Sequence, residues 1–312
     1  MTLEQVIQEM KVKPYMLSQG KGLLAKKCRC SIDVILEAKK IIRSSSPTTS
    51  PTAENKIKIL ILDIETTPMQ AYVWKRWKEN ISLDQTISEW FMICWSAKWL
   101  YSEETMGECL TPEEVANEDD SRIMRKLWTL LDEAVVVVTH NGNKFDLPKI
   151  NSRLLMNDLP PYKPVFSVDT CKVCKYTFGF SSNKLDALAG YFGFDHKLKT
   201  DFDLWKKCME GDEESLNYML EYNKMDVIIL EDVYLKLRPY IKGHPNTNLF
   251  MAEQGSYCCS CGSKDIEEVE GKYYYTSVGK YKLYRCSHCG SLSRGKEAVN
   301  RIKDIELTSV GK

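Results

Sequence analysis

Acidic residues lie at positions along the chain where they could act together on a cation. Asp63 and Glu65 end the apolar stretch ILILDIETTP, and residues i and i+2 of a strand share a face. Asp146 follows the apolar segment VVVVTHN, and Asp226 lies four residues after Tyr222 in YNKMD. Two residues that are four positions apart on a helix have their side chains on the same face. Buried carboxylates that lie side by side repel each other unless a positive charge lies between them.

Asp63, Glu65, Asp146 and Asp226 are therefore expected to converge at one end of a sheet and to bind Mg²⁺ or Mn²⁺. Both are hard cations that accept carboxylate and water ligands. Two such ions about 3.5–4 Å apart stabilise the attacking and leaving oxygens of a phosphodiester and lower the pKa of a bound water. The acids thus predict metal-dependent phosphodiester hydrolysis.

The segments DIET, HNGNKFD and YNKMD, in this order, resemble the three exonuclease motifs of the DEDD superfamily in its tyrosine-bearing branch. The resemblance covers about residues 57–240. It implies a 3′–5′ exonuclease with an RNase H-like fold, related to the proofreading domains of DNA polymerases.

The resemblance also implies roles for single residues. Asp63, Glu65 and Asp226 resemble direct ligands of the catalytic metals, and Asp146 resembles an acid that holds a metal through water. Tyr222 resembles the tyrosine that orients the attacking water, a role that suits a phenol with a pKa near 10 better than that of a base. The second motif implies that Asn141 and Phe145 contact the terminal nucleotide.

Other polar residues near these motifs have structural explanations. Asp169 follows a short strand, so we expect a turn or helix-capping role. Asp186 lies just inside a predicted helix, where a negative charge is favourable. His140 precedes Asn141, and we expect a structural histidine with satisfied hydrogen bonds. Cys171 and Cys174 have no second pair nearby, and we expect two half-buried thiols.

The carboxy-terminal cysteines predict a zinc ribbon. Cys258 and Cys261 form one C-x-x-C pair and Cys286 and Cys289 another, with 24 residues between the pairs. Four thiolates bind a structural Zn²⁺ tetrahedrally, so Cys259 and His288 are expected to be bystanders. The intervening segment KYYYTSVGKYKLYR predicts a β-hairpin. Its tyrosines either stack on bases beside lysines that meet phosphates, or cover a minimal core, and both interpretations stay open.

Alternating helical and strand patterns predict an α/β protein with an RNase H-like mixed sheet and flanking helices. Strands are expected at IKILILDIE, at ISEWFMICWSAKWLY (one or two around a turn), at VVVVTHN and at VFSVDT, and helices at residues 121–134 and 213–237. The Ser- and Thr-rich segment SSSPTTSPTAENK reads as a linker. The expected domains are a helical module (1–43), a linker (44–56), the exonuclease domain (57–250) and the zinc-ribbon module (251–312).

The amino-terminal module resembles a helix-turn-helix over residues 18–43, in which Ser31 caps the last helix. Its basic residues could bind the major groove or phosphates, which favours DNA over RNA as the partner, and a protein-interaction module is the alternative. The residues concerned are Lys26, Lys27, Arg29, Lys39, Lys40 and Arg43.

Composition narrows the class of protein further. The chain has 312 residues with 43 basic and 43 acidic side chains, a balance that argues against coating nucleic acid by bulk charge. No signal peptide and no membrane-spanning apolar run is present, so we expect a soluble cytoplasmic protein without membrane partners. Two other functions remain open: an RNase H-like endonuclease, and a non-catalytic DNA-binding or adaptor protein.

Overall fold

The structure is a computed structural model in which residues 1–12, 21–31, 33–35, 37, 38, 41, 57–194, 200–251 and 255–301 are described. The chain divides into two compact units, one formed by Lys58–Tyr234 and the other by the residues before and after it. The predicted linker, residues 44–56, lies outside the described residues. The domain boundaries expected from the sequence stay predictions.

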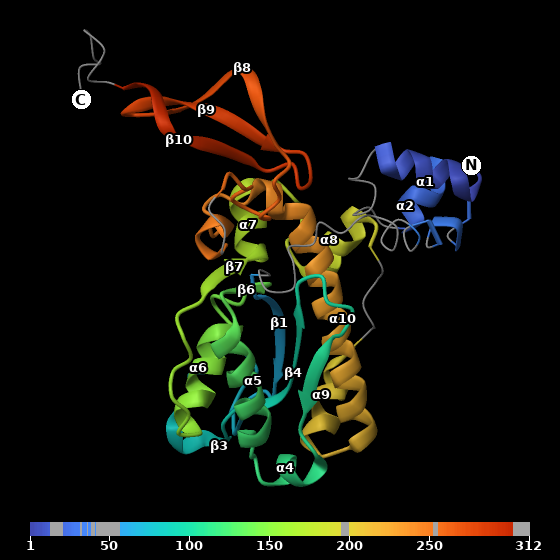
Figure 1. The fold of residues 1–312 in the computed structure, drawn as a ribbon. Helices are drawn as coiled ribbons and strands as arrows, with labels where there is room; N and C mark the ends of the chain where they lie inside the picture. The colour runs from blue at the N-terminus through green and yellow to red at the C-terminus, as the bar shows by residue number, and fades with distance from the viewer. Residues whose placement is uncertain are drawn as a thin grey trace. The chain divides into compact units, whose positions relative to one another are not determined.

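A mixed sheet forms the centre of the unit Lys58–Tyr234 (Figure 1). Its five strands have the order β5-β4-β1-β6-β7; β1 pairs in parallel with β6, and β6 with β7, whereas β4 is antiparallel to β1 and to β5. The predicted mixed α/β sheet is thus confirmed. The strands are β1 (Ile59–Thr66), β4 (Met92–Trp99), β5 (Met106–Cys109), β6 (Val136–Thr139) and β7 (Phe166–Asp169).

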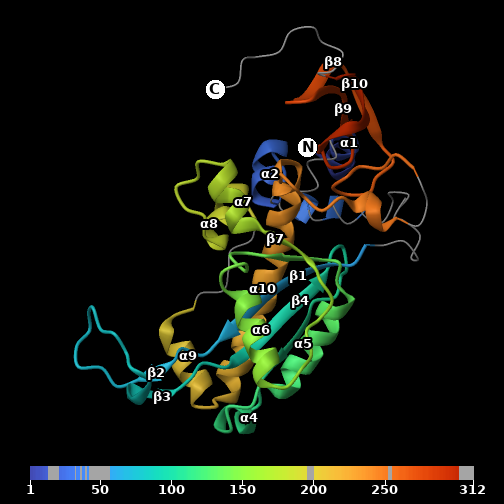
Figure 2. The ribbon, with the colours of Figure 1, turned by 90° about the vertical axis from the view of Figure 1, so that its left-hand side faces the viewer.

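Helices cover both faces of this sheet. Figures 1 and 2 show α5 and α6 on one side of it and α10 on the other. The helices of the unit are α4 (Pro112–Ala116), α5 (Ser121–Glu133), α6 (Asp146–Met156), α7 (Thr170–Thr177), α8 (Leu185–Phe192), α9 (Phe202–Met209) and α10 (Glu213–Leu237). A small two-stranded sheet, β2 (Gln70–Ala71) with β3 (Thr86–Ser88), and the 3-10 turn η3 (Leu83–Gln85) follow β1.

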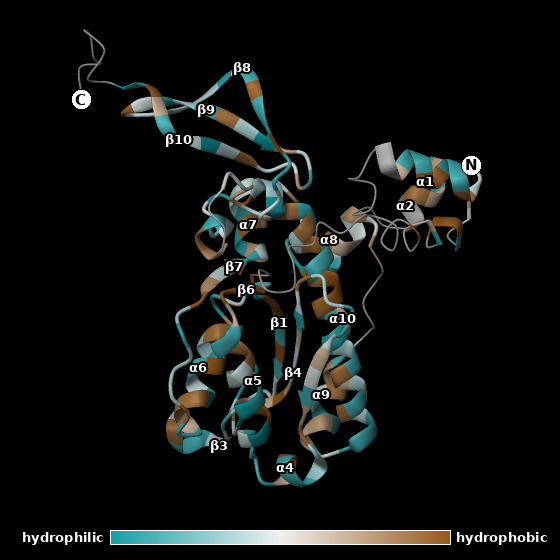
Figure 3. Ribbon diagram, in the orientation of Figure 1, coloured by the Kyte–Doolittle hydropathy of each residue, from teal (hydrophilic) through white to brown (hydrophobic). Residues whose placement is uncertain are grey.

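The central strand β1 is apolar because it is buried on both faces, as its hydropathy in Figure 3 indicates. Leu60, Leu62 and Ile64 pack in one core cluster with the apolar stripe of α5. Asp120, fully buried at the start of α5, binds the guanidinium of Arg153 on α6 and accepts a hydrogen bond of 3.0 Å from the Met92 N–H on β4. The ion pair joins α5 to α6, and the hydrogen bond from Met92 joins both helices to the sheet.

Local sequence signals set where several helices begin. Thr111 and Glu114 form a capping box at α4. The Asp169 carboxylate accepts a hydrogen bond of 3.0 Å from the Lys172 N–H and caps α7, as expected. Asp186 lies in the first turn of α8, also as expected. The segment ISEWFMICWSAKWLY forms two strands, β3 and β4, which agrees with the second of the two expected forms.

The carboxy-terminal residues form a separate antiparallel sheet in the order β10-β9-β8. Its strands are β8 (Ile266–Thr276), β9 (Gly279–Cys286) and β10 (Leu292–Arg301), preceded by the 3-10 turns η4 (Arg238–Tyr240) and η5 (Thr247–Phe250). The pairing of β8 with β9 confirms the predicted hairpin. Tyr274 is 48% exposed and Tyr275 67%, so these two rings face solvent and not a buried core.

The amino-terminal helices α1 (Leu3–Val12) and α2 (Lys21–Cys28) pack through a small cluster that includes Val6, Met10 and Leu24. The Val34 N–H donates a hydrogen bond of 3.4 Å to Ser31 Oγ, as expected of a cap. Lys26, Lys27 and Arg29 are exposed, whereas Lys39, Lys40 and Arg43 lie outside the described residues. Of the helices that the structure describes, none is long and apolar enough to cross a bilayer.

Candidate active site and zinc site

Three acidic side chains from two distant elements meet at the carboxyl end of β1. One carboxylate oxygen each of Asp63, Glu65 and Asp226 lies within 4.8 Å of the others. Asp63 and Glu65 extend from one face of β1, and Asp226 reaches them from α10. Two like charges at this separation repel by about 3.5 kcal/mol at an effective dielectric constant of about 20. A divalent cation would turn this repulsion into attraction, so the trio fits a metal site.

An irregularity in the sheet lies beside the trio. The register of β1 against β4 shifts between Glu65, which pairs with Cys94, and Thr66, which pairs with Met92. The extra residue on β4 is Ile93, and such bulges change the direction of nearby side chains. Burial raises the pKa of the Cys94 thiol well above its usual value, and the nearby Glu65 and Asp63 raise it further. Cys94 is therefore a packed thiol and not a ligand.

Asn223 fixes the orientation of Asp63, and the sequence analysis did not assign it a role. Its side-chain Nδ2 donates a hydrogen bond of 2.6 Å to Asp63 Oδ2, and the residue is fully buried on α10. Asn223 lies three residues before Asp226, so both side chains point to the same face of the helix. The three-residue spacing of Asn223 and Asp226 within YNKMD is the sequence pattern that could have indicated this role.

Asp146, the fourth acid expected at this site, is not part of the group within 4.8 Å. Its side chain is 2% exposed. Burial raises the pKa of Asp146 to about 7, backbone hydrogen bonding at Asp146 and Ile64 opposes the rise, and the charge of Asp169 adds to it. Oδ1 has no hydrogen-bond partner among the described residues. A buried carboxyl with an unused acceptor could still accept a hydrogen bond from a water.

Tyr222 lies on α10 one helical turn before Asp226 and is 8% exposed. The ring of Trp205 on α9 packs edge-on against it, with centroids 6.5 Å apart. This contact limits the positions open to the phenol. The helix thus presents Tyr222, Asn223 and Asp226 as one group, as the helical spacing predicts.

The turn after β6 holds Asn141, the first residue predicted to contact substrate. Asn141 has a positive φ of 71°, a conformation that asparagine tolerates better than most residues. Asp169 accepts hydrogen bonds from the N–H groups of Asn141 (2.9 Å) and Asn143 (3.3 Å) and so holds the turn in place. His140 bridges Thr170 Oγ1 and the Asn183 carbonyl at 2.8 Å each, which confirms its structural role.

Phe145, the second residue predicted to contact substrate, precedes α6 and is 38% exposed. The Lys149 ammonium lies 5.2 Å from its ring centroid and 3.5 Å from that of Trp90. Burial lowers the pKa of Lys149. Two aromatic rings and a cation therefore lie together at the start of α6, a combination suited to a nucleotide base and its phosphate.

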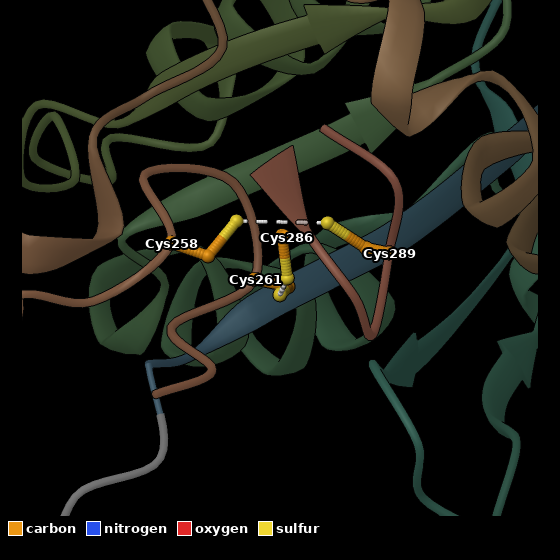
Figure 4. Close-up of side chains that lie close together, drawn as sticks. All are labelled: Cys258, Cys261, Cys286 and Cys289. Atoms are coloured by element: carbon orange, nitrogen blue, oxygen red, sulfur yellow. Dashed lines mark hydrogen bonds between the residues drawn. The ribbon is translucent and has the colours of Figure 1, made fainter. Parts of the chain in front are cut away.

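Four cysteines form the second candidate metal site (Figure 4). The Sγ atoms of Cys258 and Cys289 are 3.6 Å apart and those of Cys261 and Cys286 are 3.7 Å apart. Ligands about 2.3 Å from a tetrahedral zinc are separated by about 3.8 Å, so this spacing fits Zn²⁺. Hydrogen bonds from the Cys258 and Cys261 thiols lower the pKa of Cys289, which favours the thiolate that binds metal.

The two cysteine turns have the same backbone geometry. Gly262 and Gly290, each directly after a C-x-x-C pair, have φ values of 74° and 79°. Their N–H groups donate to the carbonyls of Cys258 and Cys286 at 2.9 Å each. Glycine adopts this left-handed conformation without steric cost, which explains its presence after each pair. Cys259 and the exposed His288 are not part of the four-thiol cluster, as expected.

Cys171 and Cys174 are free and buried on α7. Burial raises the pKa of Cys174 to about 12. Among the described residues they belong to no cluster of possible metal ligands. The expected pair of packed thiols is confirmed, and both are more completely buried than expected.

Comparison with known proteins supports the fold. The family model described as RNase_H superfamily matches residues 100–238. This span contains Asn141, Asp146, Tyr222 and Asp226 but begins after Asp63 and Glu65. A search of curated proteins found no match. With its sheet order and flanking helices, the unit Lys58–Tyr234 has an RNase H-like fold.

Among solved structures, the chain is similar to a family B DNA polymerase from the hyperthermophilic archaeon Pyrobaculum calidifontis. The identity is 17% and the TM-score 0.44, and the match covers 59% of this chain and 25% of the polymerase chain. The chain thus spans about a quarter of the length of that polymerase.

Proposed function

We propose that this protein is a metal-dependent 3′–5′ exonuclease that hydrolyses phosphodiester bonds of nucleic acid. The observation that supports this most directly is the meeting of Asp63, Glu65 and Asp226 within 4.8 Å. Carboxylates this close repel one another, so the cluster makes physical sense as a cation site. DNA is the preferred substrate, because the amino-terminal module is expected to contact a duplex.

Each residue of the site has a defined task in this proposal. Asp63, Glu65 and Asp226 hold two Mg²⁺ or Mn²⁺ ions, with Asp146 as an outer ligand through water. Bound ions of this kind supply charge stabilisation to the reacting phosphate and acidify a water. Asn223 keeps the Asp63 carboxylate in one orientation through its hydrogen bond of 2.6 Å. The Tyr222 hydroxyl orients the attacking water, and Asn141 and Phe145 position the terminal nucleotide.

The test is an incubation of 5′-labelled DNA and RNA with the full chain in Mg²⁺, in Mn²⁺ or in a chelator. We expect products that shorten one nucleotide at a time from the 3′ end, and only with metal. Asp63→Asn and Asp226→Asn should abolish the products, because each keeps the side-chain shape but removes a charged ligand. Asp186→Asn removes an exposed carboxylate on α8 and should leave the rate unchanged.

Two outcomes would contradict the proposal. Fragments cut internally from a substrate blocked at its 3′ end would assign the site to an endonuclease. Nucleic-acid binding without any metal-dependent cleavage, unchanged in Asp63→Asn, would assign the protein to the non-catalytic adaptors. Tyr222→Phe refines the proposal: a slower reaction with a substrate Kd like that of the wild type supports the water-orienting role.

A further inference from the structure

A segment that follows β1 and β2 exposes large aromatic side chains to solvent. It comprises residues 72–82, between β2 and η3, and is called the tryptophan arm (Figure 2). Trp74 is 92% exposed, Trp77 81% and Tyr72 73%. Neither tryptophan has a ring or cation–π partner among the described residues. Exposed apolar side chains gathered on one segment mark interaction sites more often than chance.

Basic residues alternate with these rings. The arm contains the sequence WKRWK, which places Lys75, Arg76 and Lys78 around Trp74 and Trp77, and Glu79 is its one acidic residue before Ser82. Within the described part of the chain, none of the three cations forms an ion pair. Their charges are therefore available to a negatively charged partner. Interleaved aromatic and basic residues are a sequence signal for nucleic-acid binding that the motifs described above do not include.

The base of the arm is braced although its tip has no regular structure. The Tyr72 N–H donates to the Gln85 carbonyl at 2.9 Å, and Gln85 Nε2 donates to the Tyr72 carbonyl at 3.1 Å. The Ser82 N–H donates to Gln85 Oε1 at 3.0 Å. These hydrogen bonds close the arm at its two ends and so hold the aromatic tip out from the domain.

The arm begins close to the acidic trio. Glu65 and Gln70, the first residue of β2, are five positions apart, so at most about 18 Å of extended chain separates them. Thr67 anchors this connection: its N–H donates to the Phe91 carbonyl and its Oγ1 accepts from the Phe91 N–H, both at 2.9 Å. A short, anchored segment therefore connects the base of the arm to the strand that bears Asp63 and Glu65.

We propose that the tryptophan arm binds single-stranded nucleic acid, with bases stacked on Trp74 and Trp77 and phosphates bound by Lys75, Arg76 and Lys78. Stacking on an indole needs the face of a base, which a duplex hides and a single strand exposes. Free cations between the rings match the spacing of alternating bases and phosphates better than they match an apolar protein surface. The inference rests on the proposed function only in naming this strand as the substrate of the site.

Binding is measured on the full chain in chelator, so that no cleavage occurs, by the fluorescence anisotropy of labelled oligo(dT) of about 20 nucleotides. We expect Trp74→Ala/Trp77→Ala to weaken binding about 10-fold or more, since stacking stabilises each bound base. Tyr176→Ala is the matched control, because Tyr176 on α7 is an aromatic residue that is 82% exposed, and it should bind like the wild type.

The basic residues have a separate readout. Replacing Lys75, Arg76 and Lys78 together by serine should lower the slope of log Kd against log salt by about 2, as expected for three lost phosphate contacts on a single strand. All six side chains changed here or in the control lie at the surface, so circular dichroism spectra should stay unchanged.

Oligo(dT) binding by Trp74→Ala/Trp77→Ala that equals the wild-type affinity would overturn the inference. If the variant then also changed the elution volume of the protein, the arm would be a contact between protein chains. Binding to a blunt duplex that Trp74→Ala/Trp77→Ala weakens as much as it weakens binding to oligo(dT) would overturn it as well. If the protein cleaves nothing but its binding to oligo(dT) depends on the arm, the inference stands and the proposed function fails. If the protein cleaves nucleic acid but its binding does not depend on the arm, the proposed function stands and the inference fails.

Discussion

At the scale of single residues, hydrogen bonds to neighbouring residues hold side chains of the candidate active site in position. Asp63 is held by Asn223, and the turn that carries Asn141 is held by the Asp169 carboxylate. Gly142 follows Asn141 in the same turn. A Cβ added to Gly142 would lie 2.2 Å from Thr139 Oγ1 and 2.4 Å from its Cβ, distances that no real contact shows.

Gly142→Ala should therefore lower the free energy of unfolding by about 1–3 kcal/mol, because the turn must move to make room for the methyl group. Urea denaturation measures the change. We expect Gly179→Ala to be close to neutral, since a Cβ at Gly179 has no heavy atom within 4 Å. Equal stabilities of the two variants would show that the turn after β6 adapts easily.

At the scale of elements, one arginine joins three of them at the edge of the sheet. Arg122 on α5 binds Glu114 of α4 through Nε at 2.6 Å and Nη2 at 2.8 Å, and Glu108 of β5 through Nη1 at 2.6 Å. Nη2 also donates to the Cys109 carbonyl at 2.7 Å. Hydrogen bonds from Arg122 lower the pKa of Glu114, despite the opposing effect of its partial burial.

The stabilisation from this group should depend on pH. Because the pKa of Glu114 is lower in the folded chain than in the unfolded one, the stabilisation is present above the unfolded value, about 4.3, and is lost as the pH falls through the folded value. Arg122→Gln should cost about 1–2 kcal/mol at pH 7, a figure reduced for the partial exposure of the arginine. The cost should shrink towards pH 3.

Chemical denaturation of wild type and variant across this pH range gives the comparison. Arg125→Gln is the control on the same helix, since Arg125 is exposed and, among the described residues, its guanidinium donates only to Ser121 Oγ, at 3.4 Å. A cost for Arg122→Gln that stays constant down to pH 3 would mean that the ion pair with Glu114 is not the source of the effect.

At the scale of the whole molecule, the two sheets have different sources of stability. The sheet of Lys58–Tyr234 lies in a large apolar core, whereas Cys286 is the one buried apolar side chain in the described strands β8, β9 and β10. A sheet without a core needs another constraint, and a structural zinc supplies it in small domains.

We expect about one zinc per chain, and its loss in Cys286→Ser should expose residues 255–301 to protease while the unit Lys58–Tyr234 stays intact. Metal analysis and limited proteolysis followed by mass spectrometry measure both effects. Cys259→Ser is the matched control, because Cys259 lies between two of the ligands but outside the four-thiol cluster. Zinc retained in Cys286→Ser would contradict the assignment.

Much of the molecule could be predicted from local patterns. The apolar run of β1, the helical spacing of Tyr222 and Asp226 and the two C-x-x-C pairs each involve residues a few positions apart. The backbone geometry of a helix or strand fixes how such neighbours lie relative to each other. Their spacing alone therefore indicates whether their side chains share a face or can bind one ion. The strands β1, β4, β6 and β7, the long helix α10 and the four-cysteine cluster followed from these signals.

Contacts between distant residues were decided only by the tertiary structure. Asn223 reaches Asp63 because α10 packs on the face of β1 that bears the acids, and Asp146 lies outside the trio. The tryptophan arm is exposed because no element of the described unit covers it. Such outcomes depend on which surfaces pack together, and packing is a property of the whole folded chain that no short window of sequence contains.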